Sequence, residues 1–497
     1  MGGEGVQFPV VDGQRSTQRT GCDVFAAAAA AVDPGLATQI RAERAWRTAY
    51  PTHLRQLTEA AADSPLAGVQ IARAGLNRVH ATFEYDGTDT TSSVMEAATS
   101  TPTTTLGTRV VDGTGERQVG LAIPCRGRAV SGDDLRAVVD DWVQRGVVEP
   151  AVRSVINRLI EHPEWLDLRD TWFGVLGAGA EMAPTGQLLR WGADIVAVDI
   201  AGDAIWRRLE HEAVAGSGRL HVPATDRSAY PLGVDLLTDT AAIRAWLEEF
   251  AHPMVLGNYA YADGETFARL SVAADAVIAA LRHRQDGHGV VCLATPTDVF
   301  AVPADVVHDT RQRDPSTWSR TLAPLLRRAS GQRLLVRNHQ NTVRTAVGDE
   351  VGIADSLVLQ QGPNYALAKR IQRWRALDSH ADGGFGAIHV APPTRTASVT
   401  KNRVLAAAYE GASLFGVEIF EPATSRSLMA ALLVHDLRIH EQDPRPAPRD
   451  EHALTAAAAH GGLWRTAWEP RSALPFTVLK GAPIALTRRG SPGADNN

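Results

Sequence analysis

The alternation of short apolar runs with amphipathic stretches, which begins near Thr171, constrains the fold of this chain most. The apolar runs are W-F-G-V-L at 172–176, A-D-I-V-A-V-D at 193–199, V-D-L at 234–236, M-V-L-G-N at 254–258 and G-V-V-C-L-A-T at 289–295. Continuous apolar strands are buried on both faces, which requires a parallel sheet with helices on either side. We therefore predict a doubly wound α/β domain over residues 169–440.

Composition divides the rest of the chain. Inside the α/β region the alternation breaks over 304–355, a polar, Arg-rich stretch that we interpret as an insertion before the helix around Tyr365. The outer segments are a flexible N-terminus at 1–20, a mainly helical N-terminal domain at 21–168 with a Thr- and Ser-rich loop at 86–118, a Pro- and Ala-rich C-terminal extension at 441–487 and a disordered tail at 488–497. Within the N-terminal domain we expect helices over 22–76 and 132–162, and a strand over 77–85.

Charge and composition exclude several classes of protein. The 497 residues carry 50 Lys and Arg against 56 Asp and Glu, a net charge of −6, so the basic stripe of a nucleic-acid-binding protein is not expected. The longest clean apolar run, 25–32, is far shorter than the ~20 residues that span a bilayer. The N-terminus lacks the basic-then-apolar pattern of a secretion signal, which predicts a cytoplasmic protein. Three widely spaced cysteines and the lack of paired histidines predict no disulfide and no metal site.

A glycine turn follows the first apolar run. Gly177 permits a tight turn, and Gly179 allows a pyrophosphate to approach the backbone at the start of the following helix. The next run ends at Asp199, about 22 residues after Gly177, where a carboxylate can accept hydrogen bonds from a ribose and repel a 2′-phosphate. The third glycine of the usual motif is replaced by Met182. We predict a nucleotide site that prefers NAD to NADP.

Tyr365 and Lys369 form a second candidate site. The two residues are four apart in Y-A-L-A-K, so on a helix they lie on one face, one turn apart. A neighbouring ammonium stabilises a phenolate, and a tyrosine whose pKa is lowered in this way can act as general acid or base. The chain has only three lysines, which makes a chance match improbable.

In chain order, several segments resemble motifs of the short-chain dehydrogenase/reductase family, in divergent form. The similar segments are L-G-A-G-A-E-M-A at 176–183, V-D-L-L-T-D at 234–239, V-L-G-N-Y-A-Y at 255–261, G-V-V-C-L-A-T-P-T at 289–297, Y-A-L-A-K at 365–369, I-H-V-A-P-P-T-R-T at 388–396 and E-P-A-T-S-R-S-L-M-A-A-L-L at 421–433. The resemblance implies a Rossmann-like fold and an NAD(P)-dependent oxidoreductase that acts on a carbonyl or alcohol of a small organic substrate. It also implies a possible homo-oligomer. The acidic charge balance and the short apolar runs predict neither a nucleic-acid nor a membrane partner.

The resemblance also implies a role for each matching residue. Tyr365 would be the general acid or base, Lys369 would hold the ribose, and Thr295, with Thr297 as second choice, would match the catalytic serine. The residues that would seat the dinucleotide are Gly177, Gly179, Met182, Asp199, Asp235, Asn258, Lys369 and Thr396. Three other functions stay open: a non-redox isomerase, lyase or cyclase step on the same fold, an S-adenosylmethionine-dependent methyltransferase, and a non-catalytic nucleotide-binding protein.

Other polar and aromatic residues are weaker candidates. We expect His339 on the surface of the insertion rather than at a substrate. Arg395 is as well explained as a surface arginine as by binding a phosphate or carboxylate. Trp464 and Trp468 can cap an apolar substrate pocket, but packing in a core or dimer interface explains them better.

Overall fold

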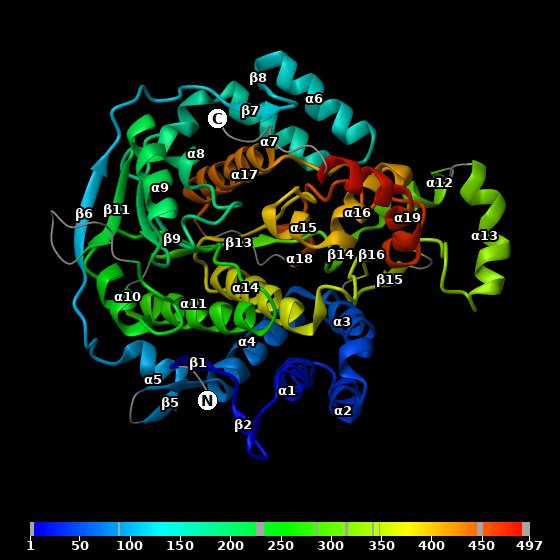
Figure 1. The fold of residues 1–497 in the computed structure, drawn as a ribbon, viewed down its shortest axis with the longest axis horizontal. Coiled ribbons are helices and arrows are strands. Elements are labelled where there is room, and N and C mark those ends of the chain that lie inside the picture. Colours follow the sequence, from blue (N-terminus) through cyan, green and yellow to red (C-terminus); the bar gives the residue numbers. More distant parts are fainter. Residues whose placement is uncertain are drawn as a thin grey trace.

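A seven-stranded sheet runs through the middle of the protein, which we describe from a computed structural model covering residues 4–87, 90–224, 233–284, 287–313, 317–339, 342–346, 348–444 and 451–489 (Figure 1). Its strands are β17 (Gly386–Val390), β13 (Gly289–Ala294), β12 (Val255–Asn258), β9 (Trp172–Leu176), β10 (Asp194–Val198), β11 (Arg219–Ala224) and β6 (Gly107–Asp112), in that spatial order. The first six are parallel, and β6 joins the edge antiparallel to β11.

The strand order confirms the predicted fold class. Counted along the chain from β9, the parallel strands lie in the order 6-5-4-1-2-3, which is the doubly wound, Rossmann-like arrangement. The order reverses between β9 and β12, and ligands of such sheets bind at the carboxyl ends of the strands beside this switch point. The fold thus points to the ends of β9, β12 and β13 as the place to look for a site.

Helices cover both faces of the sheet (Figure 1). On one side lie α8 (Thr185–Arg190), α9 (Asp203–Ala215) and α17 (Pro422–Gln442), and on the other α10 (Thr240–Leu247), α11 (Glu265–Arg284) and α14 (Gly362–Ala381). Buried side chains of the strands pack against both layers, as the continuous apolar runs require.

N-terminal helices form an outer layer beneath α14. These are α1 (Thr17–Ala30), α2 (Pro34–Ala42), α3 (Trp46–Ala61) and α4 (Pro65–Thr82). The contact of α4 with α14 is close, because a Cβ at Gly75 would lie 2.4 Å from the Trp374 ring. Phe25 of α1 meets the same indole with ring centroids 5.9 Å apart. On the opposite side, α6 (Gly132–Gln144) and α7 (Pro150–Glu161) lie beyond α17.

The structure corrects three expectations for the N-terminal region. Residues 4–20 are not loose, because they form β1 (Gly5–Gln7), β2 (Val10–Val11), β3 (Gln14–Arg15) and the start of α1, with Val6 and Phe8 buried. The strand expected over 77–85 is mostly helix, since α4 continues to Thr82. Val79 and Phe83 are spaced for a buried helix face as well as for a strand, and packing on neighbouring helices selects the helix.

The segment 86–118, expected as a loop or ribbon, contains regular structure. The hairpin of β4 (Glu84–Asp86) and β5 (Thr91–Ser93) leads to α5 (Val94–Thr99), which starts with a capping box between Ser93 and Glu96. β6 follows and pairs with β11, more than 100 residues later in the chain. Such a long-range pairing leaves no local signal in a Thr-rich stretch.

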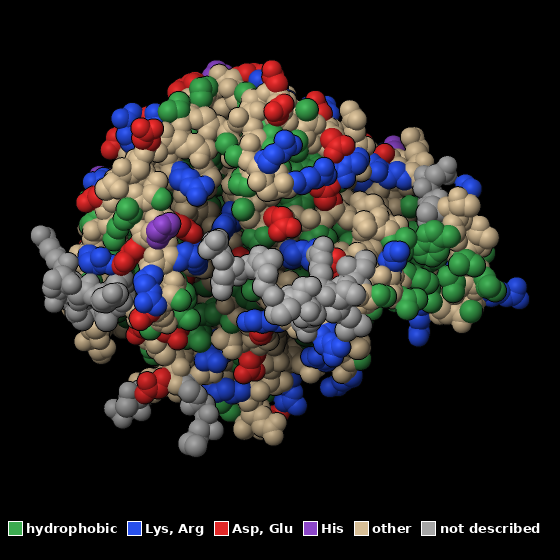
Figure 2. All heavy atoms as spheres, turned by 45° about the horizontal axis from the view of Figure 1, so that its top comes forward, with side chains coloured by type: hydrophobic (Ala, Val, Ile, Leu, Met, Phe, Trp, Pro, Cys, Tyr) green, Lys and Arg blue, Asp and Glu red, His purple; other side chains and the backbone are tan. Residues whose placement is uncertain are grey.

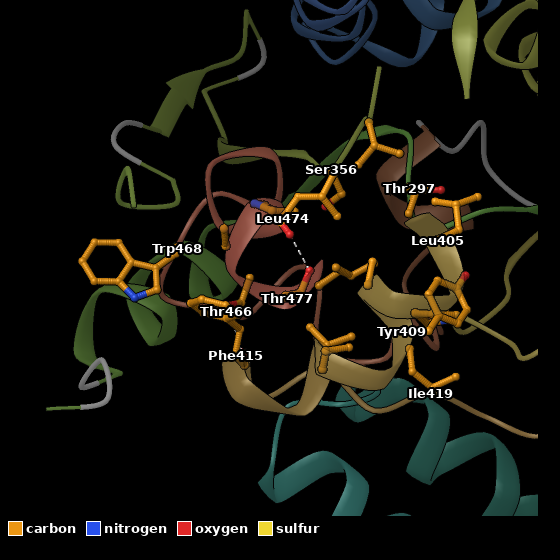
Figure 3. A pocket seen from close by; sticks show the side chains of 18 residues that line it. Thr297, Ser356, Leu405, Tyr409, Phe415, Ile419, Thr466, Trp468, Leu474 and Thr477 are labelled. Atoms are coloured by element: carbon orange, nitrogen blue, oxygen red, sulfur yellow. Dashed lines mark hydrogen bonds between the residues drawn. The ribbon is translucent and has the colours of Figure 1, made fainter. Parts of the chain in front are cut away.

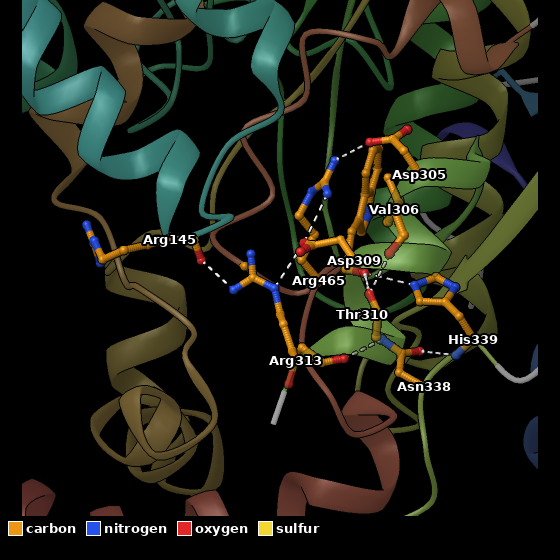
Figure 4. A network of polar contacts seen from close by, with 12 residues as sticks. Arg145, Asp305, Val306, Asp309, Thr310, Arg313, Asn338, His339 and Arg465 are labelled. Carbon is orange, nitrogen blue, oxygen red and sulfur yellow. Dashed lines mark hydrogen bonds and ion pairs between the residues drawn. The ribbon is translucent and has the colours of Figure 1, made fainter. Parts of the chain in front are cut away.

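The insertion builds a small antiparallel sheet of its own. β14 (Val299–Pro303), β16 (Glu350–Asp355) and β15 (Thr342–Arg344) pair in this order, with α12 (Ala304–Gln312) and α13 (Thr317–Ala329) between β14 and β15. An arginine network ties α12 to the body of the protein (Figure 4): Arg465 bonds Asp305 and Asp309 at 3.0 and 3.1 Å, and Arg313 donates to the Arg145 carbonyl at 2.9 Å.

α13 lies at one end of the molecule and exposes apolar side chains. Leu322 and Leu325 are exposed on this helix, and hydrophobic atoms gather at that end of the surface (Figure 2). No helix among the described ranges has the length and hydrophobicity needed to cross a bilayer.

The C-terminal elements close the end of the sheet that carries the strand carboxyl termini. They are α15 (Ala397–Lys401), α16 (Arg403–Gly411), η2 (Ala412–Phe415), α18 (Glu451–Leu454) and α19 (Pro470–Arg489). α16 and α19 pack closely, because a Cβ at Gly411 would lie 2.0 Å from the Thr477 carbonyl oxygen. Residues 490–497 of the predicted tail lie outside the described residues.

Candidate active site

Gly177 fixes the turn that follows β9. Its φ of +83° lies in the left-handed region that favours glycine, and its N–H donates to the Val198 carbonyl at 2.8 Å. A Cβ at this position would lie 2.3 Å from the backbone nitrogen of Ala260, which follows β12. The glycine thus allows the loops after β9 and β12 to meet at the switch point of the sheet.

Asp199 directly follows β10 and faces the same turn. One carboxylate oxygen accepts a hydrogen bond from the Gly179 N–H at 2.6 Å, and the other accepts one from the N–H of the next residue, Ile200, at 2.8 Å. Burial raises the pKa of Asp199, while these two backbone bonds oppose the shift. Arg208 of α9 donates to the Gly179 carbonyl at 2.5 Å. The carboxylate therefore lies where the sequence predicts it, and in this structure it binds the turn itself.

The helix behind the glycine turn does not begin directly at the turn. α8 starts at Thr185, three residues after Met182. Pro184 disfavours helical backbone at the residue before it, which explains the delay. Instead, Ala180 and Ala183 donate their N–H groups to carbonyls within the turn at 3.0 Å. Met182 is half-buried against the core between the sheet and α17.

Asp235 and Asn258 lie close to the turn. The N–H of Val234 donates to the Asp199 carbonyl at 2.9 Å, which brings Asp235 beside the end of β10. Asp235 accepts the Leu237 N–H at 2.9 Å. Asn258, the buried last residue of β12, accepts the Ala260 N–H at 3.2 Å.

Tyr365 lies in the first turn of α14 and is half-buried. Its phenol lies near the hydroxyl of Thr295, which follows β13, and that hydroxyl lowers the pKa of the phenol. The Thr295 hydroxyl is in turn 2.9 Å from that of Thr297, and the Gln361 amide donates to Thr297 at 2.6 Å. Three hydroxyl groups thus form a line at the carboxyl end of β13.

The electrostatics of Tyr365 differ from the sequence expectation. Burial raises the pKa of its phenol, and the nearby Thr295 hydroxyl offsets only part of this shift. The phenols of Tyr261 and Tyr409 lie close enough to raise the pKa further. The side chain is therefore protonated at neutral pH and is ready to donate a proton.

Lys369 lies one turn further along α14 and points toward the sheet. Its Nζ donates to the Leu293 carbonyl of β13 at 2.9 Å and to the Gln372 side chain at 3.1 Å. It also lies 5.5 Å from the ring centroid of Phe267, which packs against Tyr365 at 5.4 Å. Burial lowers the pKa of Lys369, because the charged form loses hydration.

Gln372 is a site residue that the sequence reasoning missed. Its amide donates to the Ser271 hydroxyl of α11 at 3.4 Å, so it links Lys369 to the opposite helix. Gln372, Ser271 and Asn258 border a small internal cavity between α11, α14 and β13. The position of Gln372, three residues after Lys369 on the same helix, is the signal that could have identified it.

The loop after β17 reaches back to the glycine turn. Glu181 accepts the Ala397 N–H at 2.7 Å, and the Thr396 hydroxyl is 3.0 Å from that of Ser398. Arg395 forms an ion pair with Glu410 of α16. The structure therefore places Thr396 beside the turn and gives Arg395 a structural partner.

An apolar cavity of about 100 Å³ opens next to the three hydroxyl groups (Figure 3). Thr297 and Pro393 line one part, α16 and η2 contribute Leu405, Ala408, Tyr409, Ala412 and Phe415, and the C-terminal extension contributes Leu463, Thr466, Trp468, Pro470, Ala473, Leu474 and Thr477. None of the described residues that line the cavity is charged. Burial raises the pKa of Tyr409 to about 12.

Three weaker sequence candidates are placed as follows. His339 is buried rather than exposed, with Nε2 2.8 Å from the Trp464 carbonyl, and burial lowers its pKa to about 4. Trp464 packs in the core against Phe300, with ring centroids 5.3 Å apart. Trp468 is also buried, and it lines the apolar cavity. The described residues hold no cluster of His, Cys, Asp or Glu that could bind a metal.

No protein-family model and no curated protein matches the chain. Among solved structures, the chain is similar to two crystal structures of 3-oxoacyl-[acyl-carrier protein] reductase from Brucella melitensis, one of them in complex with NAD. The NAD complex is 14% identical, with a TM-score of 0.32 over 60% of this chain and 98% of that chain. The other is 13% identical, with a TM-score of 0.30 over 59% and 98%. The fold assignment rests on the strand order.

Proposed function

We propose that this chain is an NAD-dependent oxidoreductase that interconverts a carbonyl and an alcohol. The observation that carries the proposal is the proximity of the Tyr365 phenol to the Thr295 hydroxyl at the carboxyl edge of a doubly wound sheet, with the half-buried Lys369 ammonium one turn away. A protonated phenol beside a second hydroxyl can bind and protonate a carbonyl oxygen. This supports acid–base chemistry on an oxygen of the substrate.

The residues of the turn fit a dinucleotide. Gly177 lets the loops after β9 and β12 meet at the switch point, because a Cβ there would lie 2.3 Å from the Ala260 nitrogen. The Asp199 carboxylate directly follows β10, where it can exchange its bonds to the turn for ribose hydroxyls. Asp199 would repel a 2′-phosphate, which favours NAD over NADP. When bound, the nicotinamide supplies or accepts the hydride.

The protein's own groups perform the remaining steps. Thr295 and Tyr365 bind the substrate oxygen, and Tyr365 gives it a proton during reduction or takes one during oxidation. Lys369 is held by Leu293 and Gln372 and offers its remaining N–H to the ribose or to the phenol. Its charge stabilises the phenolate that proton donation leaves behind.

Ligand binding separates this proposal from the other functions of this fold. Purified protein is titrated with NADH, NADPH and S-adenosylmethionine, and binding is measured by fluorescence and thermal shift. We expect NADH to bind and to stabilise the protein most. Stabilisation by S-adenosylmethionine alone would contradict the proposal.

The Tyr365→Phe variant tests the chemistry. With NADH carrying deuterium at C4, we expect deuterium transfer to a panel of ketones that falls by about 10²–10⁴-fold in the variant, while NADH affinity changes little. Tyr85→Phe is the matched control for the chemistry, because this phenol bonds the Thr238 carbonyl and not Thr295. Equal rates in Tyr365→Phe and wild type would remove Tyr365 from the mechanism.

A further inference from the structure

We infer that the substrate is an uncharged carbonyl compound whose apolar part, a short alkyl chain or a single ring, is bound in the cavity beneath α16 and α19. This inference rests on the proposed function, because it assigns the cavity to the substrate of Tyr365. It goes beyond that function by naming the chemical class of the substrate and the segment that selects it.

The cavity is continuous with the candidate catalytic residues. Thr297 lines it and its hydroxyl is 2.9 Å from that of Thr295, which in turn lies near the Tyr365 phenol. Tyr409, also in the lining, lies close enough to affect the pKa of Tyr365. In Figure 3, Thr297, Leu405 and Tyr409 lie at one end of the cavity and Trp468 at the other. A carbonyl at Tyr365 therefore leaves its substituent directed into this space.

The far end of the cavity offers nothing to a charged or strongly polar group. The Thr466 hydroxyl donates to the Phe415 carbonyl at 3.1 Å, and the Thr477 hydroxyl donates to the Leu474 carbonyl at 2.7 Å. Apart from the hydroxyl of Ser356, the other lining groups there are aliphatic or aromatic. A carboxylate placed among them would lose its hydration without a partner, which costs several kcal/mol.

Volume limits the size of the apolar group. The cavity measures about 100 Å³, somewhat less than the ~150 Å³ of an engineered apolar cavity that takes up benzene. Its walls are held rigidly, because Gly411 and Gly481 let α16 and α19 pack at backbone contact distance. We therefore expect selection for a group of about four to six carbons.

The C-terminal extension forms the wall of the cavity that we expect to select the substrate. Residues between Leu463 and Thr477 supply seven of the lining side chains. They lie beyond the segment that resembles a dehydrogenase in sequence. The extension thus adds specificity to the doubly wound domain.

The test compares ketones with different tails. 2-Hexanone, cyclohexanone and the charged 4-oxopentanoate are each titrated against the full chain in the presence of NADH, with binding measured by calorimetry and turnover by NADH oxidation. We expect both uncharged ketones to bind at least tenfold more tightly than 4-oxopentanoate. Equal or tighter binding of 4-oxopentanoate would overturn the inference.

Two variants locate the binding site. Ala408→Phe fills the cavity and is expected to weaken 2-hexanone binding at least tenfold, whereas the control Val404→Phe, on the exposed side of α16, leaves it unchanged. Leu405→Ala enlarges the cavity and is expected to raise the affinity for 2-octanone relative to 2-hexanone. If neither Ala408→Phe nor Leu405→Ala changes ketone binding in folded protein, the inference fails.

The two proposals fail in different ways. Ketone binding in the cavity without hydride transfer would contradict the oxidoreductase function and keep the cavity as an apolar binding site. Hydride transfer to ketones without a preference among tails would keep the function and contradict the substrate class.

Discussion

Within one turn, α14 carries two kinds of buried cation. Lys369 is held by a backbone carbonyl and a glutamine amide, and no described carboxylate forms an ion pair with it. Arg370 and Arg373, in contrast, share the buried carboxylate of Asp298, and Arg373 also pairs with Glu451 at 2.5 Å. Both arginines thus have a carboxylate in direct contact, whereas Lys369 has none among the described residues.

This difference separates structure from function on the same helix. A buried ion pair with its hydrogen bonds satisfied holds elements together, here α14, the start of β14 and α18. A buried ammonium bound only to neutral acceptors has a lowered pKa and an unused N–H, and such groups concentrate at functional sites. The predictions below test whether the two kinds of cation serve these different purposes.

Removing the shared carboxylate should have the largest effect on stability. Asp298→Ala leaves two buried guanidinium groups without their partner, and we expect the free energy of unfolding to fall by about 3–5 kcal/mol. Asp12→Ala, which breaks an exposed ion pair with Arg19, is the control and should change stability little. Urea unfolding measures both, and similar small losses would show that the Asp298 cluster is not structural support.

The raised pKa of Tyr365 predicts opposite pH dependence for the two directions of reaction. The phenol stays protonated above neutral pH, so ketone reduction should not slow between about pH 7 and 9. Alcohol oxidation needs the deprotonated phenol, so its rate should rise by up to about tenfold per pH unit over the same range. Initial rates of both directions check this, and an oxidation rate that falls with pH would contradict it.

Lys369→Met keeps the length of the side chain and removes its charge. We expect a loss of about 10–100-fold in kcat/KM for NADH, the value of one or two charged hydrogen bonds, with little loss of stability. Lys480→Met, in the exposed part of α19, is the matched control. A large loss of stability with unchanged kinetics would show that Lys369 has a structural role, like Arg370 and Arg373.

Gln372→Leu should have the smallest effect. Lys369 loses one of its two acceptors, so its charge becomes less favourable and the alkaline limb of the activity profile should move to lower pH, with a loss of a few fold in kcat. The exposed Gln144→Leu of α6 is the control. An unchanged pH profile would show that Gln372 does not position the lysine.

The sequence predicted the part of the fold that depends on local pattern. Four of the five apolar runs correctly indicated parallel strands, namely β9, β10, β12 and β13. The run V-D-L at 234–236 was wrongly predicted as a strand, and the third parallel strand of the order is β11, which the pattern missed. The interruption at 304–355 corresponds to α12, α13, β15 and β16, of which the two strands pair with β14 in a separate sheet. The pairing of β6 with β11 and the burial of Val6 and Phe8 depend on contacts between distant segments, which a local pattern does not contain. For the same reason, the sequence predicted a strand around Val79 and Phe83, where the structure has the last turn of α4.

The candidate site, like the fold, could be predicted from the sequence only in part. Tyr365 and Lys369 were visible as a spacing on one helix, and Asp199 as the end of a strand. The apolar cavity joins Thr297, α16 at Arg403–Gly411 and the extension between Leu463 and Thr477, which are far apart in the sequence, so only the folded chain reveals it. The direction of the Tyr365 pKa shift also required the structure, because burial outweighs the effects of its neighbours.

A crystal structure of the protein with bound NADH tests the central claim most directly. We predict that the adenosine ribose contacts Asp199 and that the nicotinamide ring lies between Tyr365 and the loop after β17, with its reactive carbon facing the apolar cavity. A dinucleotide bound with its nicotinamide away from Tyr365, or protein that remains free of dinucleotide at saturating NADH, would contradict the account.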